Sequence, residues 1–329
     1  MSQEVTNGLQ RWWPILLGLA VLLVISSSLF QRWNTETLVS HPNPVKNYAE
    51  AVERIQAIQA GETDLNPLCV TRFMTHGEQT ERVIVLVHGY TNCPQQFAEL
   101  GKRFYDLGYN VLIVPLPGHG LADRLTDAQG KLKAEDFTAY ADQVVDIAQG
   151  LGRRVAISGI SLGGVICAWA VQNRSDVDFA MIISPGFSFQ GVPNWLRAPI
   201  ENIFVNIPAT YEWWDPVLKE DGSPPYTYPR YSKHTLGEAM RLGLAVQAQA
   251  ERAAPQGKAI LIVTNGNDPS VDNLVTQEVG RIWRAHGATV DTYEFDAGLR
   301  LGHDLIDPND KGGNIELVYP RLIALVNQR

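Results

Sequence analysis

A serine lies between two glycines in an apolar stretch of the chain that reads VAISGISLGGVICAW. Residues 155–158 are typical of a short buried strand, and residues 162–173 are typical of a helix. A strand, a tight glycine turn and a helix form the context in which the motif Gly-x-Ser-x-Gly displays a nucleophile, here Ser161 between Gly159 and Gly163. A free serine hydroxyl is a poor nucleophile near neutral pH, so the chain must also supply a base and a carboxylate.

Histidine is the side chain best suited to take the serine proton near neutral pH. Only two of the seven histidines, His286 and His303, follow the strand predicted at 259–264, which should carry the carboxylate. His286 ends a predicted helix just before Gly287, where a histidine commonly serves the helix terminus or faces water. His303 lies in the segment LGHDL, in a loop after the last predicted strand. These two residues are the candidates for the base.

The carboxylate that orients the base is predicted in the loop after 259–264. Asp268 lies there among glycine and asparagine, at the sheet edge where active-site loops gather. Asp272 is a rival, but it stands where the next predicted helix needs an N-cap. Asp304 and Asp307 follow the second histidine too closely to be easy partners, and they are typical turn residues. Asp268 is therefore the preferred orienting carboxylate.

Short apolar strands and helical patterns alternate along the chain, which predicts an α/β fold with a mainly parallel sheet covered by helices on both faces. One long segment, 186–257, interrupts the alternation, is rich in aromatic residues, and is predicted to be an inserted cap over the carboxyl ends of the strands. The strands are expected at 69–75, 82–88, 110–115, 154–158, 178–183, 259–264 and 290–295, and the helices near 95–107, 135–151, 162–174, 272–286 and 313–328.

Five segments occur in a characteristic order: VLVHGYTNCPQQF, VPLPGHG, GISLGG, TNGNDPSVD and RLGHDL. With these segments the chain resembles the α/β-hydrolase superfamily, and within it the carboxylesterase and monoacylglycerol-lipase-like branch. The resemblance extends from Arg82 to the carboxyl terminus and is weakest through the predicted cap. Any one of the motifs alone would be weak, whereas five in this order at plausible spacings are a specific signal.

The resemblance implies a role for each candidate residue. His303 lies where the family places its base, and Ser161, Asp268 and His303 follow the order described for this fold. The backbone N–H of Leu162, next after the nucleophile, is expected to stabilise an oxyanion. The second N–H donor in this family follows a His-Gly pair, which makes it Tyr90 here. His88 and His119 are expected to have structural roles in their own loops.

Composition excludes several other classes of protein. A net charge of −8 over 329 residues, without a basic block, argues against nucleic-acid binding. The motifs His-Glu-x-x-His and Cys-x-x-Cys and a glycine-rich phosphate loop ending in lysine are absent from the sequence, so we expect neither a metal nor another cofactor. The expected organisation is a segment 1–33 that anchors the chain or directs its export, a linker and leading helix at 34–68, and a hydrolase domain at 69–329.

The amino-terminal segment predicts a membrane span. Residues 12–30 carry no charge and are nearly long enough to cross a bilayer as a helix. Trp12, Trp13 and Trp33 stand where an interfacial aromatic belt would lie. We expect an uncleaved transmembrane anchor with the catalytic domain outside the cytoplasm, and the alternative is a cleaved signal peptide and a secreted protein.

Cysteine usage leaves two alternatives open. Cys69 opens one predicted strand, and Cys93 follows the end of the next, so an antiparallel pairing of the two strands would bring the cysteines close together. They form either a disulfide, in an oxidising compartment, or two free thiols. Cys167 lies in the apolar helix after Ser161 and is expected to be a small core residue.

The resemblance implies a serine hydrolase that forms an acyl-enzyme on Ser161 and releases it with water activated by His303. Esters of medium-length or fatty acids, including monoacylglycerol, are the expected substrates. A thioesterase, an aminopeptidase or an acyltransferase would use the same triad, because one fold hosts many chemistries. A membrane-tethered binding module without catalysis is the alternative from another class. Covalent labelling of Ser161 by a fluorophosphonate distinguishes the two alternatives, because only an enzyme with an activated serine would be labelled.

Overall fold

The computed structural model describes residues 14–19, 22–23, 27, 29–30 and 35–327. Its main element is a seven-stranded sheet with the order β1-β3-β2-β4-β5-β8-β9. Strand β1 pairs antiparallel to β3, and all other neighbours in this sheet are parallel. The strands are β1 (Arg72–Met74), β2 (Thr80–Val87), β3 (Asn110–Ile113), β4 (Gly152–Ser161), β5 (Phe179–Pro185), β8 (Ala259–Asn265) and β9 (Val290–Phe295).

The central strands are buried on both faces, so they are nearly continuous apolar runs instead of alternating ones. Alternate side chains of β2 still separate to the two faces. Val83, Val85 and Val87 belong to one buried cluster, and Ile84 and Leu86 belong to the other. The predicted mainly parallel sheet is therefore confirmed, and a hydrophobic core lies on each of its faces.

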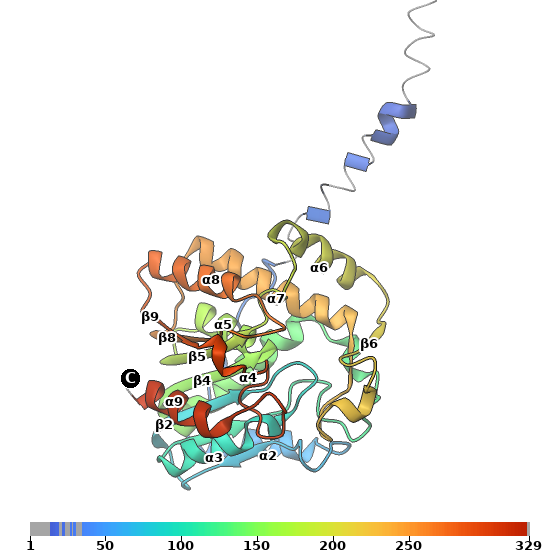
Figure 1. Cartoon of the computed structure of the whole chain (residues 1–329). Helices are drawn as coiled ribbons and strands as arrows, with labels where there is room; N and C mark the ends of the chain where they lie inside the picture. The colour runs from blue at the N-terminus through green and yellow to red at the C-terminus, as the bar shows by residue number, and fades with distance from the viewer. Residues whose placement is uncertain (1–13, 20–21, 24–26, 28, 31–34, 328–329) are drawn as a thin grey trace, which may run out of the picture.

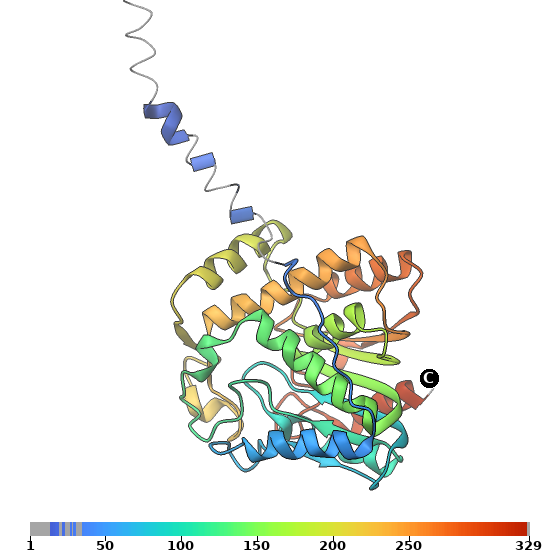
Figure 2. The same cartoon turned by 180° about the vertical axis from the view of Figure 1, so that it is seen from behind.

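Helices cover both faces of this sheet (Figures 1 and 2). Side chains of α3 and α9 contribute to one buried cluster, and side chains of α2, α4, α5, α7 and α8 contribute to the other. The helices are α2 (Tyr48–Ala60), α3 (Ala98–Asp106), α4 (Ala134–Leu151), α5 (Leu162–Asn173), α6 (Arg197–Asn206), α7 (Lys233–Arg252), α8 (Asn273–Ala285) and α9 (Ile315–Asn327).

The long segment between β5 and β8 contains α6, the antiparallel pair β6 (Tyr211–Trp213) and β7 (Arg230–Ser232), and α7. Helix α7 packs against α5, and Ala239, Leu242 and Val246 belong to the same buried cluster as α5. Helix α6 packs against α7 and lies at the outer end of the molecule in Figure 1. The segment thus combines a helix of the main core with a smaller outer part.

The predicted transmembrane helix over 12–30 is wrong. Among the described residues, no helix combines the length and the apolar character that crossing a membrane requires. The remainder of the prediction, at 12–13, 20–21, 24–26 and 28, lies outside the described residues. The expected membrane contact and the membrane-anchored localisation lose their support with it.

Candidate active site

Ser161 occupies a strained turn between β4 and α5. Its backbone φ of 57° and ψ of −119° lie in a region that residues with a side chain rarely adopt. The two neighbouring glycines make the turn feasible, since a Cβ on Gly163 would overlap the carbonyl oxygen of Val87, and a Cβ on Gly159 would overlap the backbone of Gly163. This local geometry displays the partly exposed Ser161 at the carboxyl end of β4.

Asp268 and His303 form a direct pair, although 35 residues separate them in the sequence. The Nδ1 atom of His303 lies 3.0 Å from Oδ1 and 2.9 Å from Oδ2 of Asp268. The Asp268 side chain is fully buried and also accepts hydrogen bonds from the backbone N–H groups of Ser270 and Val271. This arrangement leaves Nε2 as the ring nitrogen of His303 that can exchange a proton with a reacting group.

The pair keeps Asp268 ionised and makes His303 a stronger base. Burial raises the pKa of Asp268, but the hydrogen bond from His303 and the two backbone N–H groups outweigh it, so this pKa lies below its ordinary value. Burial lowers the pKa of His303, and the hydrogen bond and charge of Asp268 overcome this effect, so this pKa lies above its ordinary value. A carboxylate that stays ionised can therefore stabilise an imidazolium.

The other carboxylates and histidine considered from the sequence have different partners. Asp272 caps α8 and accepts the N–H of Leu274. Asp307 accepts a hydrogen bond from the Tyr226 hydroxyl. His286 ends α8, where its backbone N–H bonds to carbonyls of the last turn. The structure thus brings Asp268 and His303 together, whereas within the described part of the chain Ser161 Oγ forms no hydrogen bond with His303.

The loop after β2 lies against the Ser161 turn. An ideal Cβ on Gly89 would lie 3.5 Å from Cβ of Ser161. The Gly89 carbonyl faces His88 Nδ1 at 2.9 Å and accepts the N–H of Asn92 at 3.2 Å. A trans peptide carries its C=O and N–H in opposite directions, so these two contacts fix the direction of the Tyr90 N–H.

His88 is a neutral positioning residue in this loop. Its Nε2 accepts the backbone N–H of Leu116 at 2.9 Å, so Nδ1 carries the proton and donates it to the Gly89 carbonyl. Burial lowers the pKa of His88 to about 3. The sequence suggested a structural role within the loop, and the additional bond to Leu116 connects that loop to the one after β3.

The segment between β5 and β8 also contacts the loop after β2. The sequence did not reveal these contacts. Thr91 has a positive φ of 62°, and its hydroxyl accepts a hydrogen bond from Trp214 Nε1 at 2.8 Å. Its carbonyl accepts the N–H of Tyr228 at 2.8 Å. The Tyr90 hydroxyl donates to the Ser232 carbonyl at 3.0 Å. Neither spacing nor residue type signals these contacts, because they join segments more than a hundred residues apart.

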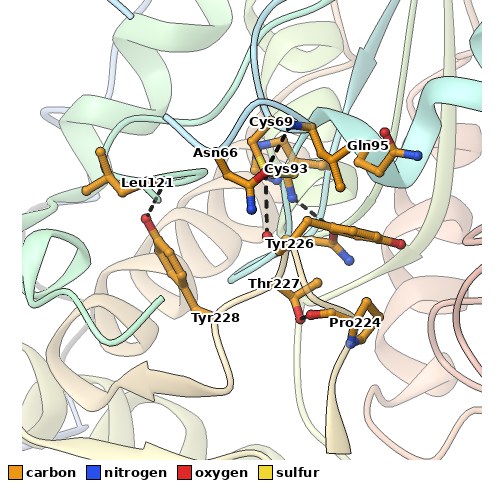
Figure 3. Close-up of a disulfide and its surroundings, with 12 residues drawn as sticks. Asn66, Cys69, Cys93, Gln95, Leu121, Pro224, Tyr226, Thr227 and Tyr228 are labelled. Carbon is orange, nitrogen blue, oxygen red and sulfur yellow. Dashed lines mark hydrogen bonds between the residues drawn. A yellow bond between two sulfur atoms is a disulfide. The ribbon is translucent and has the colours of Figure 1, made fainter. Parts of the chain in front are cut away.

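Cys69 and Cys93 are joined by a disulfide, with 5.3 Å between their Cα atoms (Figure 3). The bridge is buried beside Tyr226, whose hydroxyl bonds to Asp307 in the loop that follows His303. It therefore ties the end of the loop after β2 to the segment before β1. Cys167 is buried in α5. Among the described residues, no cluster of His, Cys, Asp and Glu side chains is arranged to hold a metal ion.

A comparison with known protein families identifies the family of this chain. Residues 78–295 match the family model described as serine aminopeptidase S33. The chain belongs to this family. Its match spans β2 to β9 and includes Ser161 and Asp268. The resemblance expected from the sequence, to lipase-like α/β-hydrolases, is confirmed by this family and by the relatives below.

Two bacterial proteins are similar to part of this chain. It is 26% identical to lysophospholipase L2 of Escherichia coli K12 over 161 residues, which cover 44% of this chain and 46% of the relative. It is 24% identical to a thermostable monoacylglycerol lipase of Bacillus sp. over 100 residues, which cover 29% and 36%. The matched segments thus span less than half of each relative.

Solved structures share the fold at low sequence identity. A monoglyceride lipase of Saccharomyces cerevisiae superimposes with a TM-score of 0.61 at 14% identity, covering 81% of this chain and 95% of the other. A monoacylglycerol lipase of Paleococcus ferrophilus gives 0.58 at 16% identity, covering 81% and 99%. These likenesses establish an α/β-hydrolase fold.

Proposed function

We propose that this S33 family hydrolase cleaves carboxylic esters through an acyl-enzyme on Ser161. The observation that carries the proposal is the pair of the buried Asp268 and the partly exposed His303, on loops after β8 and β9, in a fold whose β4 ends in the strained Ser161 turn. The carboxyl ends of neighbouring parallel strands meet at one edge of a sheet, so these loops gather around the serine. Gly89 beside Ser161 adds the loop after β2 to the same edge.

In the proposed acylation, His303 Nε2 takes the hydroxyl proton while Ser161 Oγ attacks the ester carbonyl. The carbonyl electrons move onto oxygen, and the N–H groups of Tyr90 and Leu162 stabilise the resulting oxyanion. Leu162 is suited to this role because it begins α5, where the first N–H groups have no acceptor within the helix. Asp268 stabilises the imidazolium and does not itself take the proton.

The tetrahedral intermediate then collapses. The bond to the alcohol breaks, and His303 delivers its proton to the departing oxygen, which leaves the acyl group on Ser161. A water molecule next loses a proton to His303 and attacks the acyl carbonyl, and the second collapse releases the acid and restores Ser161. No step requires a metal ion or an organic cofactor.

The proposed substrates are esters with one acyl chain, of medium or long length, including monoacylglycerols and lysophospholipids. This choice is supported by the names of the similar relatives, a monoacylglycerol lipase and a lysophospholipase. Within the segment between β5 and β8, the Trp214 side chain bonds to Thr91 in the loop after β2, is 49% exposed and offers apolar surface near the proposed site.

The test uses the full chain and p-nitrophenyl esters from acetate to palmitate. We expect hydrolysis by the wild type and loss of at least about a thousandfold in kcat for Ser161→Ala and His303→Ala. Two matched controls come from the rival residues. His286→Ala and Asp272→Asn should keep kcat within about twofold, because both lie at the ends of α8.

A fluorophosphonate probe supplies an independent reading, since it labels only an activated serine. The wild type should be labelled and Ser161→Ala should not. A folded wild type that is neither labelled nor active on any ester would refute the proposed function. Activity on an aminoacyl p-nitroanilide in place of the esters would favour a peptidase, the activity that the family description names.

A further inference from the structure

Gln96 is a fully buried amide that the proposed reaction does not use. It lies in the short 3-10 helix η1 (Pro94–Phe97), which follows the loop after β2. A buried amide left without partners costs about 1–3 kcal/mol, so its hydrogen bonds show what the side chain is held for. Both ends of this amide meet loops that belong to the proposed active site.

The oxygen of Gln96 faces one of these loops. Oε1 accepts the backbone N–H of Gly89 at 2.8 Å. A backbone N–H can only donate, so this contact fixes the orientation of the amide and turns its nitrogen the other way. Gly89 lies beside Ser161 and immediately precedes Tyr90, the proposed oxyanion donor.

The nitrogen of Gln96 faces the other loop. Nε2 donates to Oδ1 of Asp304 at 2.8 Å, across 208 residues of sequence. Asp304 follows His303 directly, so the backbone that carries the proposed base is held by this bond. The charged acceptor makes the bond stronger than one between neutral groups.

We propose that Gln96 is a positioning residue that links the oxyanion loop to the loop of the base, so that Tyr90 N–H and His303 keep one spacing around Ser161. This inference rests on the proposed function. A single side chain that bridges the two loops makes their positions depend on each other. The link acts through Gly89 and Asp304 and touches no reacting atom.

The charge of Asp304 also affects the proposed site. Burial raises the pKa of Asp304 to about 6, and the charge of His303 and the hydrogen bond from Gln96 act in the opposite direction. Two further carboxyl groups, on Asp307 and Asp310, raise it. The amide donor therefore helps to keep Asp304 ionised, and the charge of Asp304 in turn raises the pKa of His303.

Exchanging donor and acceptor tests the link. In Gln96→Glu, position 96 can still accept the Gly89 N–H, but a second carboxyl group replaces the amide donor and repels the Asp304 carboxylate when both are ionised. In the double variant Gln96→Glu with Asp304→Asn, the new amide at 304 donates to the new carboxylate at 96. The pair is restored with its direction reversed. Asp304→Asn alone keeps an acceptor for Gln96 Nε2.

The assay is ester hydrolysis by the full chain at the pH optimum of each variant, together with thermal unfolding. Gln96→Glu should lower kcat about 100-fold, with KM within about twofold, because the loss of the bond to Asp304 changes the spacing between the oxyanion loop and the base while substrate binding is kept. The double variant should regain at least about tenfold in kcat. Asp304→Asn alone keeps an acceptor for Gln96, so its kcat should fall less than that of Gln96→Glu, and the loss of the Asp304 charge should move the acid limb of kcat/KM to lower pH.

Gln95→Glu is the matched control. It makes the same substitution one residue earlier in η1, where Gln95 is partly exposed and accepts a hydrogen bond from Arg72. Its kcat should be that of the wild type. If Gln96 had only a structural role, Gln96→Glu would lower the unfolding temperature, and kcat would not fall selectively while KM stayed constant.

Three results would overturn the proposed link between the two loops. A loss under about tenfold in Gln96→Glu, no recovery in the double variant, or an equal loss in Gln95→Glu overturns the link. If Gln96→Glu does not fold, the double variant decides. A folded double variant with kcat within about tenfold of the wild type supports the link, and an unfolded or less active one overturns it. A wild type inactive on every ester refutes the proposed function and the role of Gln96 with it.

Discussion

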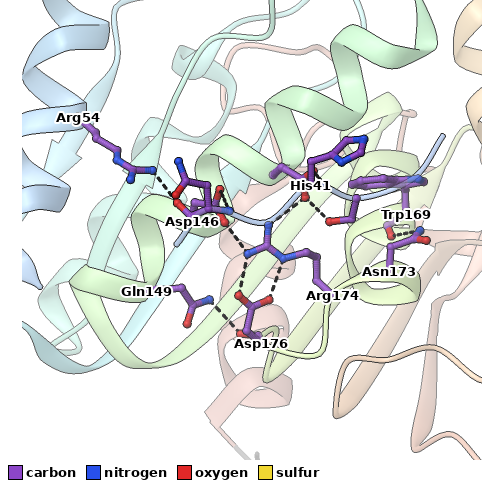
Figure 4. A network of polar contacts seen from close by, with 11 residues as sticks. His41, Arg54, Asp146, Gln149, Trp169, Asn173, Arg174 and Asp176 are labelled. Carbon is purple, nitrogen blue, oxygen red and sulfur yellow. Dashed lines mark hydrogen bonds and ion pairs between the residues drawn. The ribbon is translucent and has the colours of Figure 1, made fainter. Parts of the chain in front are cut away.

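Removing the buried cation Arg174 should destabilise the fold without impairing the proposed active site. Its side chain is only 1% exposed and contacts Asp142 at 2.9 Å, Asp146 at 2.7 Å and Asp176 at 2.7 Å (Figure 4). Asp142 and Asp146 also accept the backbone N–H groups of residues 41 and 43, so the same charges hold the segment before α2 against α4.

The expected magnitude follows from this burial. Removing one partner of a buried ion pair costs about 3–5 kcal/mol, because the remaining charge is left uncompensated. Arg174→Met keeps much of the aliphatic volume and leaves two buried carboxylates facing each other. For a domain of this size the loss corresponds to a fall of roughly 10 °C in the unfolding temperature. Burial already raises the pKa of Asp146 against the influence of Arg174, so this carboxylate is poorly stabilised without the arginine.

Thermal unfolding followed by circular dichroism measures this loss, and ester hydrolysis at 25 °C measures the site. Arg174 caps the carboxyl end of α5, and Ser161 precedes the other end of this 12-residue helix, roughly 18 Å away. We therefore expect kcat to stay within about twofold. Arg281→Met is the control, because that arginine is 66% exposed in its pair with Glu278 and should not shift the midpoint measurably. A shift below about 2 °C for Arg174→Met would refute the reasoning.

Two further predictions concern the proposed base and the disulfide. A neutral base is required and Asp268 raises the pKa of His303, so the acid limb of kcat/KM should lie above pH 6.5 and move to lower pH in Asp268→Asn, while the rate falls by up to about 10⁴. The rates of both proteins are measured over about pH 5 to 9, and an acid limb at the same pH in Asp268→Asn and in the wild type would contradict this prediction. Replacing Cys69 and Cys93 together by serine should lower the free energy of unfolding by about 3–4 kcal/mol, given a sequence separation of 24. Urea titrations of both proteins measure the difference, and equal midpoints would argue against it.

Local signals in the sequence were enough to predict the parts of the site that depend on local geometry. The Ser161 turn follows from a buried strand, a helix and two glycines whose Cβ atoms would have no room. The choice of Asp268 over Asp272 followed from a capping position, and Asp272 does cap α8. These features need no knowledge of distant contacts, because a few neighbouring residues determine them.

Contacts between distant segments could not be predicted in this way. The bond from Gln96 to Asp304 joins two polar residues of common types, and no periodic pattern marks either. The same holds for Arg174, which gathers carboxylates from α4 and from the turn after α5. The membrane prediction failed for a related reason. It relied on the apolar composition of 12–30, whereas no helix among the described residues is long and apolar enough to cross a membrane.

The contacts around the loop after β2 suggest how the fold prepares the proposed oxyanion site. From the body of the molecule, His88 holds the Gly89 carbonyl and Gln96 holds the Gly89 N–H. From the segment between β5 and β8, Trp214 holds Thr91 in its positive-φ conformation. Such a conformation persists only where the surroundings over-determine it, and here contacts act from both sides. The Tyr90 N–H is thus oriented before any substrate binds. Donors that need no reorganisation during the reaction are the ones that lower its barrier most.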